Sequence, residues 1–183
     1  MPFAEDSLSI VTKMESYLPI YCACRNMIAP TLQVTAIVKG DTFTSHGYDH
    51  CIRIFQQLNN LLTGHTPFFD NITKEELFCL GMAVLFHDVY MTKNPEMRAS
   101  HSRLARDFVR GEFERLKTSV LSLPVSDPVI DTIGEIVLAH SDVKDDMGRV
   151  IERTLDGVKD STHSGNDGPI RANILAALLR FGD

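Results

Sequence analysis

The sequence predicts an all-α fold, with five to seven helices in a single domain that spans residues 1–183. Apolar residues recur at three- and four-residue intervals along most of the chain, which is typical of amphipathic helices. The composition, with 44% hydrophobic and 23% charged residues, is that of an ordinary globular protein. A chain of 183 residues can bury about two-thirds of the surface that it exposes when unfolded, so it needs no disulfide or metal to fold.

The N-terminal sequence predicts one helix, followed by an interruption of helical structure at a proline. Apolar residues between Leu8 and Ile20 predict an amphipathic helix over residues 7–21. Pro30 is expected to interrupt the chain, because proline donates no backbone hydrogen bond. The β-branched stretch that follows, residues 31–43, fits either an extended connection or a helix.

Two helices are predicted in the middle of the chain. Residues 46–62 carry apolar side chains at helical spacing, and Gly64 supplies a stop. Thr73 and Glu76 have the spacing of a capping box and precede the apolar run LFCLGMAVLF. Such continuous hydrophobicity predicts a central helix, buried on most sides, which ends at His87 and Asp88.

Three further helices are predicted in the second half. Residues 100–117 form a surface helix with one apolar stripe, and residues 129–140 form the next helix after an N-cap at Ser126. Residues 141–168 are polar and predict a mobile flap with one short element. Pro169 is expected to open the last helix, which closes the chain at Asp183.

Composition also excludes several classes of protein. A net charge of −6 argues against binding to duplex nucleic acid, which needs clustered Lys and Arg. No apolar run reaches the roughly 20 residues of a membrane helix, and the N-terminus lacks the pattern of a signal peptide. We therefore expect a cytoplasmic protein without membrane contact. The cysteines are expected to be reduced, buried thiols: Cys22, Cys24, Cys51 and Cys79.

Histidine and aspartate residues fall at the ends of the predicted helices. His50 lies in the first turns of one helix, His87 and Asp88 end the most apolar helix, and Asp183 ends the last. Imidazole and carboxylate groups suit divalent transition metals, and a cation would offset the unfavourable burial of this charge. For a single His-Asp pair, a hydrogen-bonded histidine beside a capping aspartate is the more ordinary explanation, and only the whole set of residues favours a metal.

Taken together and in order, these motifs resemble the HD-domain superfamily of metal-dependent phosphohydrolases. The resemblance runs from Thr42 to the C-terminus and rests on the phrases DHCIRIF, LFHDVYM and NILAALLRFGD. The phrases HGYDH, HDVYM, RASHSRLA and VLAHSD are most similar to the HD-CE branch, which is often found beside GHKL-type ATPase modules.

The resemblance implies one or two divalent metal ions, drawn from Mn, Fe, Co, Ni, Mg and Zn. A first ion would be held by residues that match the family's first ligand, its namesake pair and its last ligand: His50, His87, Asp88 and Asp183. A second ion would be held by His101 and His140, with Asp88 bridging the two ions. Taken singly, either of these two histidines also fits a solvated or capping role.

The implied chemistry is hydrolysis of a phosphate ester by a metal-activated water. Asp88 would orient the nucleophile. His46 lies one helical turn before His50 and would protonate the leaving oxygen, or else it caps the helix start. Arg53 would steady a phosphate or carboxylate oxygen, although an ordinary surface salt bridge explains it as well.

Three features depart from better-known members of the superfamily. Met91 stands where many signalling members carry a lysine, three positions after Asp88. Ser141 and Asp142 follow a single histidine where cyclic-dinucleotide hydrolases have a histidine pair and a downstream GYP, which counts against that substrate. Asp183 is the final residue of the chain, where termini usually fray, so we expect the natural chain to continue.

Two functions follow from the sequence. The first is a phosphohydrolase or phosphodiesterase that acts on a nucleotide or a single-stranded nucleic acid. The alternative is a catalytically silent HD-fold domain that senses a ligand or supports a partner ATPase. An intact set of candidate ligands favours the enzyme.

Overall fold

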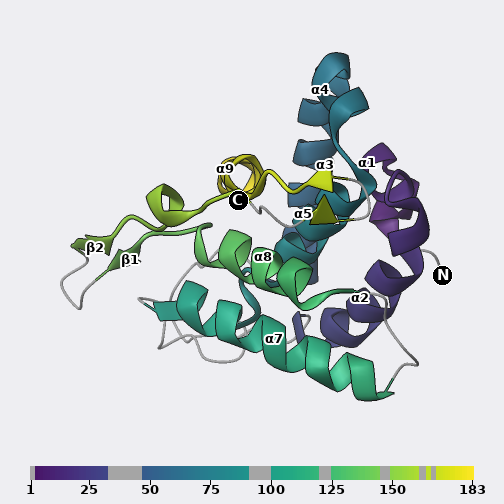
Figure 1. Cartoon of the computed structure of the whole chain (residues 1–183). Coiled ribbons are helices and arrows are strands. Elements are labelled where there is room, and N and C mark those ends of the chain that lie inside the picture. Colours follow the sequence, from purple (N-terminus) through teal and green to yellow (C-terminus); the bar gives the residue numbers. More distant parts are fainter. Residues whose placement is uncertain are drawn as a thin grey trace.

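The fold is all-α, as predicted. The computed structural model describes residues 3–32, 47–90, 100–119, 125–144, 149–160, 164–165 and 168–183, and Figure 1 shows their arrangement. Six of the described helices have eleven or more residues: α2 (Leu18–Leu32), α3 (Tyr48–Gly64), α5 (Lys74–Phe86), α7 (His101–Ser119), α8 (Asp127–Leu138) and α9 (Ala172–Gly182). None of the described helices is both long and apolar enough to cross a membrane.

Short elements fill the connections between these helices. The described short helices are α1 (Ser9–Thr12), α4 (Thr66–Asn71) and the 3₁₀ turns η1 (Ala4–Ser7), η2 (Glu15–Tyr17) and η4 (Thr154–Gly157). The described strands form two small antiparallel pairs, β1 (Val143–Lys144) with β2 (Val150–Glu152), and β3 (Ser164–Gly165) with β4 (Gly168–Pro169).

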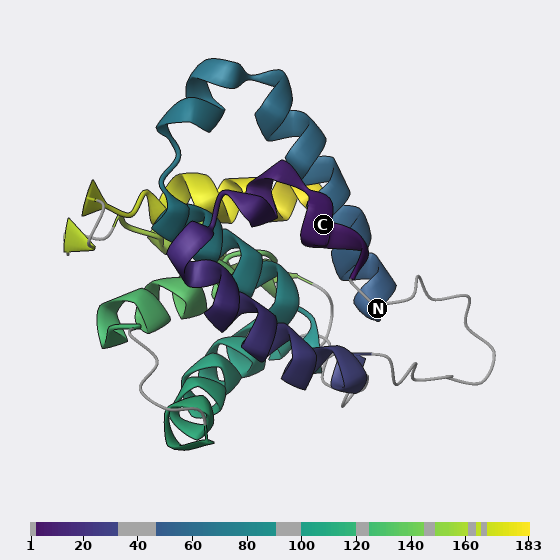
Figure 2. The same ribbon diagram turned by 90° about the vertical axis from the view of Figure 1, so that its right-hand side faces the viewer.

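Helix α5 is the centre of the fold. All of its residues from Glu75 to Phe86 are buried. It contacts α2, α3, α8 and α9, and Figure 1 shows it enclosed among them. Figure 2 shows the N-terminal residues running across α3, with which both α1 and η1 are in contact. The continuous apolar run of α5 is therefore explained by burial on every side.

The start of α5 has the predicted capping box. The Thr73 hydroxyl accepts a hydrogen bond from the Glu76 amide at 3.1 Å, and the Glu76 carboxylate accepts one from the Thr73 amide at 3.0 Å. These two bonds satisfy backbone donors that the first turn of a helix otherwise leaves free.

Helices α5 and α9 lie side by side and run in the same direction. At their starts, Arg171 donates to the buried Glu76 carboxylate from its backbone amide at 3.0 Å and from its side chain at 2.7 and 2.6 Å. The helices have 13 and 11 residues, or roughly 20 and 16 Å at 1.5 Å per residue. Because hydrogen bonds hold the two starts together and the helices are similar in length, their C-terminal ends lie near each other.

Two N-terminal predictions are wrong. The expected helix over residues 7–21 is divided into α1, η2 and the start of α2, and Glu15, the first residue of η2, has a left-handed φ of 48°. Pro30 does not break the chain, because it lies in the last turn of α2, where the helix continues to Leu32. At that position proline removes one hydrogen bond, while buried neighbours such as Ile28 keep the turn packed. The undecided stretch 31–43 lies outside the described residues from residue 33 onward.

The C-terminal third also differs from expectation. Pro169 lies in β4, and α9 begins at Ala172 with Arg171 as its N-cap, because Arg171 is held by Glu76. The predicted flap over residues 141–168 contains the β1–β2 pair, η4 and β3 within its described part. All four cysteines are free thiols, and three are buried while Cys22 is partly exposed.

We predict that Arg171→Ala lowers the free energy of unfolding at pH 7 by about 2–4 kcal/mol, because it leaves the buried Glu76 carboxylate without its charged partner. Burial raises the pKa of Glu76, but the hydrogen bonds from Arg171 and Thr73 lower it below its ordinary value. The stabilisation is therefore present above the unfolded pKa and is lost as the pH falls through the folded pKa. Urea denaturation of both proteins between neutral and acidic pH measures the difference, which should shrink towards acid.

Arg110→Ala is the control, since it breaks an exposed ion pair with Asp131 and should change stability little. A difference between wild type and Arg171→Ala that does not depend on pH would contradict the assignment to Glu76.

Candidate metal centre

Five helix ends meet at one place in the structure. The starts of α3 and α7 bring His50 and His101, and the ends of α5, α8 and α9 bring His87 with Asp88, His140 and Asp183. These are the six residues that the sequence predicts as metal ligands. Their donor atoms form two groups that share Asp88, and within each group the atoms lie within 4.8 Å of one another.

The first group contains His50, His87, Asp88 and Asp183. The His50 Nε2 atom lies 2.8 Å from Asp183 Oδ1 and 3.9 Å from Asp88 Oδ2. The His87 Nε2 atom lies 3.4 Å from each of the same two oxygens. Two donors that each bind one ion at about 2.1 Å are roughly 3.0–3.4 Å apart. The two separations from His87 therefore suit a shared cation, while His50 lies closer to Asp183 and farther from Asp88 than that range.

The second group contains Asp88, His101 and His140. The Nε2 atoms of the two histidines are 2.8 Å apart, and each lies 3.7 Å from Asp88 Oδ1. Asp88 thus turns Oδ2 towards the first group and Oδ1 towards the second. A carboxylate with one oxygen facing each group is arranged as a bridge between two ions would be.

His87 provides the test of whether a cation fits. Its Nδ1 atom lies 2.8 Å from the Val84 carbonyl oxygen, and because a carbonyl only accepts, Nδ1 is the donor. When the ring is neutral, which is the form that binds metals, Nε2 presents a lone pair to two carboxylates. This buried atom has no hydrogen-bond partner in the described structure. A lone pair that faces carboxylate oxygens in the protein interior calls for a positive charge between them, which a divalent cation supplies.

His140 is oriented in the same way as His87. Its Nδ1 atom donates to the Val137 carbonyl oxygen at 2.6 Å, which leaves Nε2 as an acceptor that faces His101 and Asp88. Burial lowers the pKa of His140 to about 4, with a further contribution from His87. His140 is therefore neutral at pH 7, which is the form that binds metals.

The electrostatics of the first group also favour a cation. Burial lowers the pKa of His87, but the carboxylates of Asp88 and Asp183 raise it to about 10. Burial raises the pKa of Asp183, and the neighbouring imidazoles of His50 and His87 bring it well below its ordinary value. The C-terminal ends of α5, α8 and α9 add partial negative charge at the same place.

Close packing brings the ligand-bearing ends together. Gly182 lets the end of α9 approach α3, since a Cβ atom there would lie 3.1 Å from the Ile54 side chain and 3.3 Å from that of Leu58. The Cys51 thiol donates to the Val84 carbonyl oxygen at 3.3 Å, the same oxygen that accepts from His87. These contacts fix the start of α3 against the ends of α5 and α9.

One further link could not be predicted from the sequence. Arg180 Nη2 lies 2.8 Å from Asp142 Oδ2, so an ion pair joins the end of α9 to the segment after His140. The partners are 38 positions apart, and only the fold reveals that they meet. The hydrogen bonds of His87 and His140 to carbonyls three residues earlier could have been predicted from the sequence, because the last carbonyl groups of a helix have no partner within the helix.

The structure does not place every residue of the predicted site. His46, the proposed proton donor, lies outside the described residues. Arg53 is exposed on α3, about one turn beyond His50. Its predicted contact with substrate remains a prediction.

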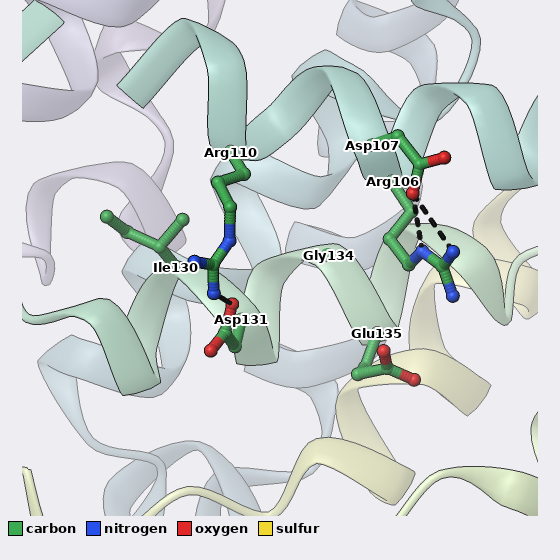
Figure 3. Close-up of a pocket in the computed structure, with 7 residues that line it drawn as sticks. All are labelled: Arg106, Asp107, Arg110, Ile130, Asp131, Gly134 and Glu135. Atoms are coloured by element: carbon green, nitrogen blue, oxygen red, sulfur yellow. Dashed lines mark hydrogen bonds and ion pairs between the residues drawn. The ribbon is translucent and has the colours of Figure 1, made fainter. Parts of the chain in front are cut away.

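A groove lies between α7 and α8, and its lining residues differ from those of the metal centre. It has a volume of about 520 Å³ and contains none of the six candidate ligands. Figure 3 shows that its arginines face carboxylates within the groove, with Arg106 paired to Asp107 and Arg110 paired to Asp131. Because each arginine is paired with a carboxylate and Glu135 adds a further negative charge, the groove is poorly suited to a phosphate.

The comparisons with known proteins agree with this geometry. The model of the HD-CE family matches residues 40–183, which include all six candidate ligands. No curated protein and no solved structure matches the chain. On the match over most of its length, the chain belongs to the HD-CE family.

Proposed function

We propose that the chain is a metal-dependent phosphohydrolase or phosphodiesterase whose centre holds up to two divalent cations. The observation that carries the proposal is Asp88, whose two oxygens face two separate groups of histidines. His50, His87 and Asp183 complete the first site, and His101 and His140 complete the second. Membership of the HD-CE family supports the same assignment.

Divalent cations at this centre would acidify a water molecule and offset the negative charge of a phosphoryl group. The protein residues then have distinct tasks. The buried Asp88 carboxylate would orient the attacking water by accepting its hydrogen bond. His46, which precedes His50 by four residues in the sequence, would give a proton to the leaving oxygen, for which an imidazole is well suited at neutral pH. Arg53 would hold a phosphate oxygen.

The proposed substrate is a phosphate ester of a nucleotide or of a single-stranded nucleic acid. The net charge of −6 disfavours a long duplex, whose binding depends on a broad basic surface. The alternative function is a catalytically silent HD-fold domain that senses a ligand or supports a partner ATPase. Metal binding without turnover on any phosphate ester would favour that alternative.

We predict that the purified chain binds about two Mn²⁺ ions and that His140→Ala binds about one. Removal of His140 takes a donor from the second group and leaves the four donors of the first. Elemental analysis and isothermal titration calorimetry measure the stoichiometry. His65→Ala is the matched control, because His65 is an exposed histidine at the α3–α4 junction. Equal stoichiometry in wild type and His140→Ala would contradict the second site.

We predict that a panel of phosphate esters, assayed with Mn²⁺, Co²⁺, Ni²⁺ and Fe²⁺, yields hydrolysis that His87→Ala abolishes. His87 is a buried candidate ligand, so its loss should exceed the roughly 10–100-fold effect of losing an outer-shell partner. Activity that survives in His87→Ala would place the reaction elsewhere. Failure of the folded chain to bind any of these ions would contradict the proposal itself.

We predict that His46→Ala retains its metal but loses about 10²–10⁴-fold in kcat, because a general acid contributes that much to catalysis. Metal content and turnover are measured on the same sample. The loss should be smallest for substrates with good leaving groups, which need no protonation. Loss of metal from His46→Ala would instead make His46 a ligand or a structural residue.

A further inference from the structure

The first turn of α3 carries His50 and has no side-chain capping hydrogen bond within the described part of the chain. Its N-cap is Gly47, which has no side chain to accept a capping hydrogen bond. Helix ends fray when their free backbone groups have no partner, and a fraying turn would carry His50 away from the other ligands. A contact outside the helix would add to the order of this turn.

Tyr48 supplies that contact. The residue is only 4% exposed, and its ring lies edge-on to Phe3 with the centroids 5.5 Å apart. Its hydroxyl donates a hydrogen bond to the Glu5 carboxylate, and Glu5 is completely buried in η1. A buried hydroxyl bonded to a buried carboxylate is a strong, charge-assisted link.

Arg25 of α2 holds Glu5 in position. Its guanidinium Nη1 atom lies 3.3 Å from Glu5 Oε1 and also pairs with Asp6. The guanidinium carbon lies 3.9 Å from the centre of the Phe3 ring, so the same group stacks on the ring that packs against Tyr48. A buried carboxylate without such a partner would be strongly unfavourable.

Glu5 and Arg25 precede residue 40, where the match to the HD-CE family begins, whereas Tyr48 and His50 lie inside it. The family match therefore does not account for this link. We propose that the N-terminal segment is a positioning device for the metal centre, in which Arg25 fixes Glu5 and Glu5 fixes Tyr48, so that the first turn of α3 presents His50 to the ion. The inference rests on the proposed metal site.

The expected effect is on metal affinity. If the first turn is ordered only part of the time, the apparent affinity falls by the fraction of chains in which His50 is in place. Tyr48→Phe removes the hydroxyl but keeps the ring that packs on Phe3. The chain should remain folded, while the ligand-bearing turn loses its link to Glu5.

The structure offers a closely matched control. Tyr17 is also buried and donates to a buried glutamate, Glu75 Oε1, at 2.7 Å. Glu75 lies in the first turn of α5, at the opposite end of that helix from His87. Tyr17→Phe therefore removes the same kind of bond from the same N-terminal region, without touching the end of a helix that carries a ligand.

The test is Mn²⁺ titration of wild type, Tyr48→Phe and Tyr17→Phe by calorimetry, together with hydrogen exchange of the backbone amides of residues 50–52. We expect Tyr48→Phe to bind Mn²⁺ roughly tenfold more weakly and to exchange these amides faster. Tyr17→Phe should lose comparable thermal stability while keeping the wild-type Mn²⁺ affinity and amide exchange rates.

Equal Mn²⁺ affinity in wild type and Tyr48→Phe, or an equal loss of affinity in both variants, would overturn the positioning role of Tyr48 and leave the proposed metal site standing. Absence of Mn²⁺ binding in the wild type would overturn it together with the proposed function.

Discussion

The structure depends on the burial of two ionisable groups at the end of its most apolar helix. His87 and Asp88 follow α5 directly and are almost inaccessible to solvent. Such groups are strongly unfavourable in a protein interior unless charge of opposite sign surrounds them. Without an ion, a proton on a histidine between the carboxylates supplies part of this compensation. A divalent cation satisfies the same atoms more completely, because it accepts lone pairs from imidazoles and carboxylates at once.

The packing of the helices brings the compensating groups to the end of α5. Glu76 and Arg171 align the starts of α5 and α9, so that the ends of these helices arrive together and Asp183 lies beside His87. Three helix C-termini then surround the site with partial negative charge. Glycine at position 182 allows the last of them to approach α3 closely. Alignment at one end of the core thus sets the spacing of donors at the other.

Much of this was predictable from local sequence patterns, and the rest was not. The capping box at Thr73 and the positions of histidines at helix ends follow from spacing along the chain, and spacing is visible in a sequence. The link between Glu5 and Tyr48 joins residues 43 positions apart, and no periodicity reports such a pair. The break predicted at Pro30 was wrong because the effect of a proline depends on where the helix ends, which tertiary packing decides. The metal-ligand roles themselves, and the role of His46, remain predictions.

The central claim is that ends of separate helices converge to hold a cation. Crystals grown with Mn²⁺ and measured with anomalous diffraction at the manganese edge test it most directly. The account predicts an anomalous peak among the side chains of His50, His87, Asp88 and Asp183, with a second peak on the other side of Asp88 beside His140. Well-ordered crystals soaked in Mn²⁺ that show no peak at this centre, with the histidines bonded directly to the carboxylates, would contradict it.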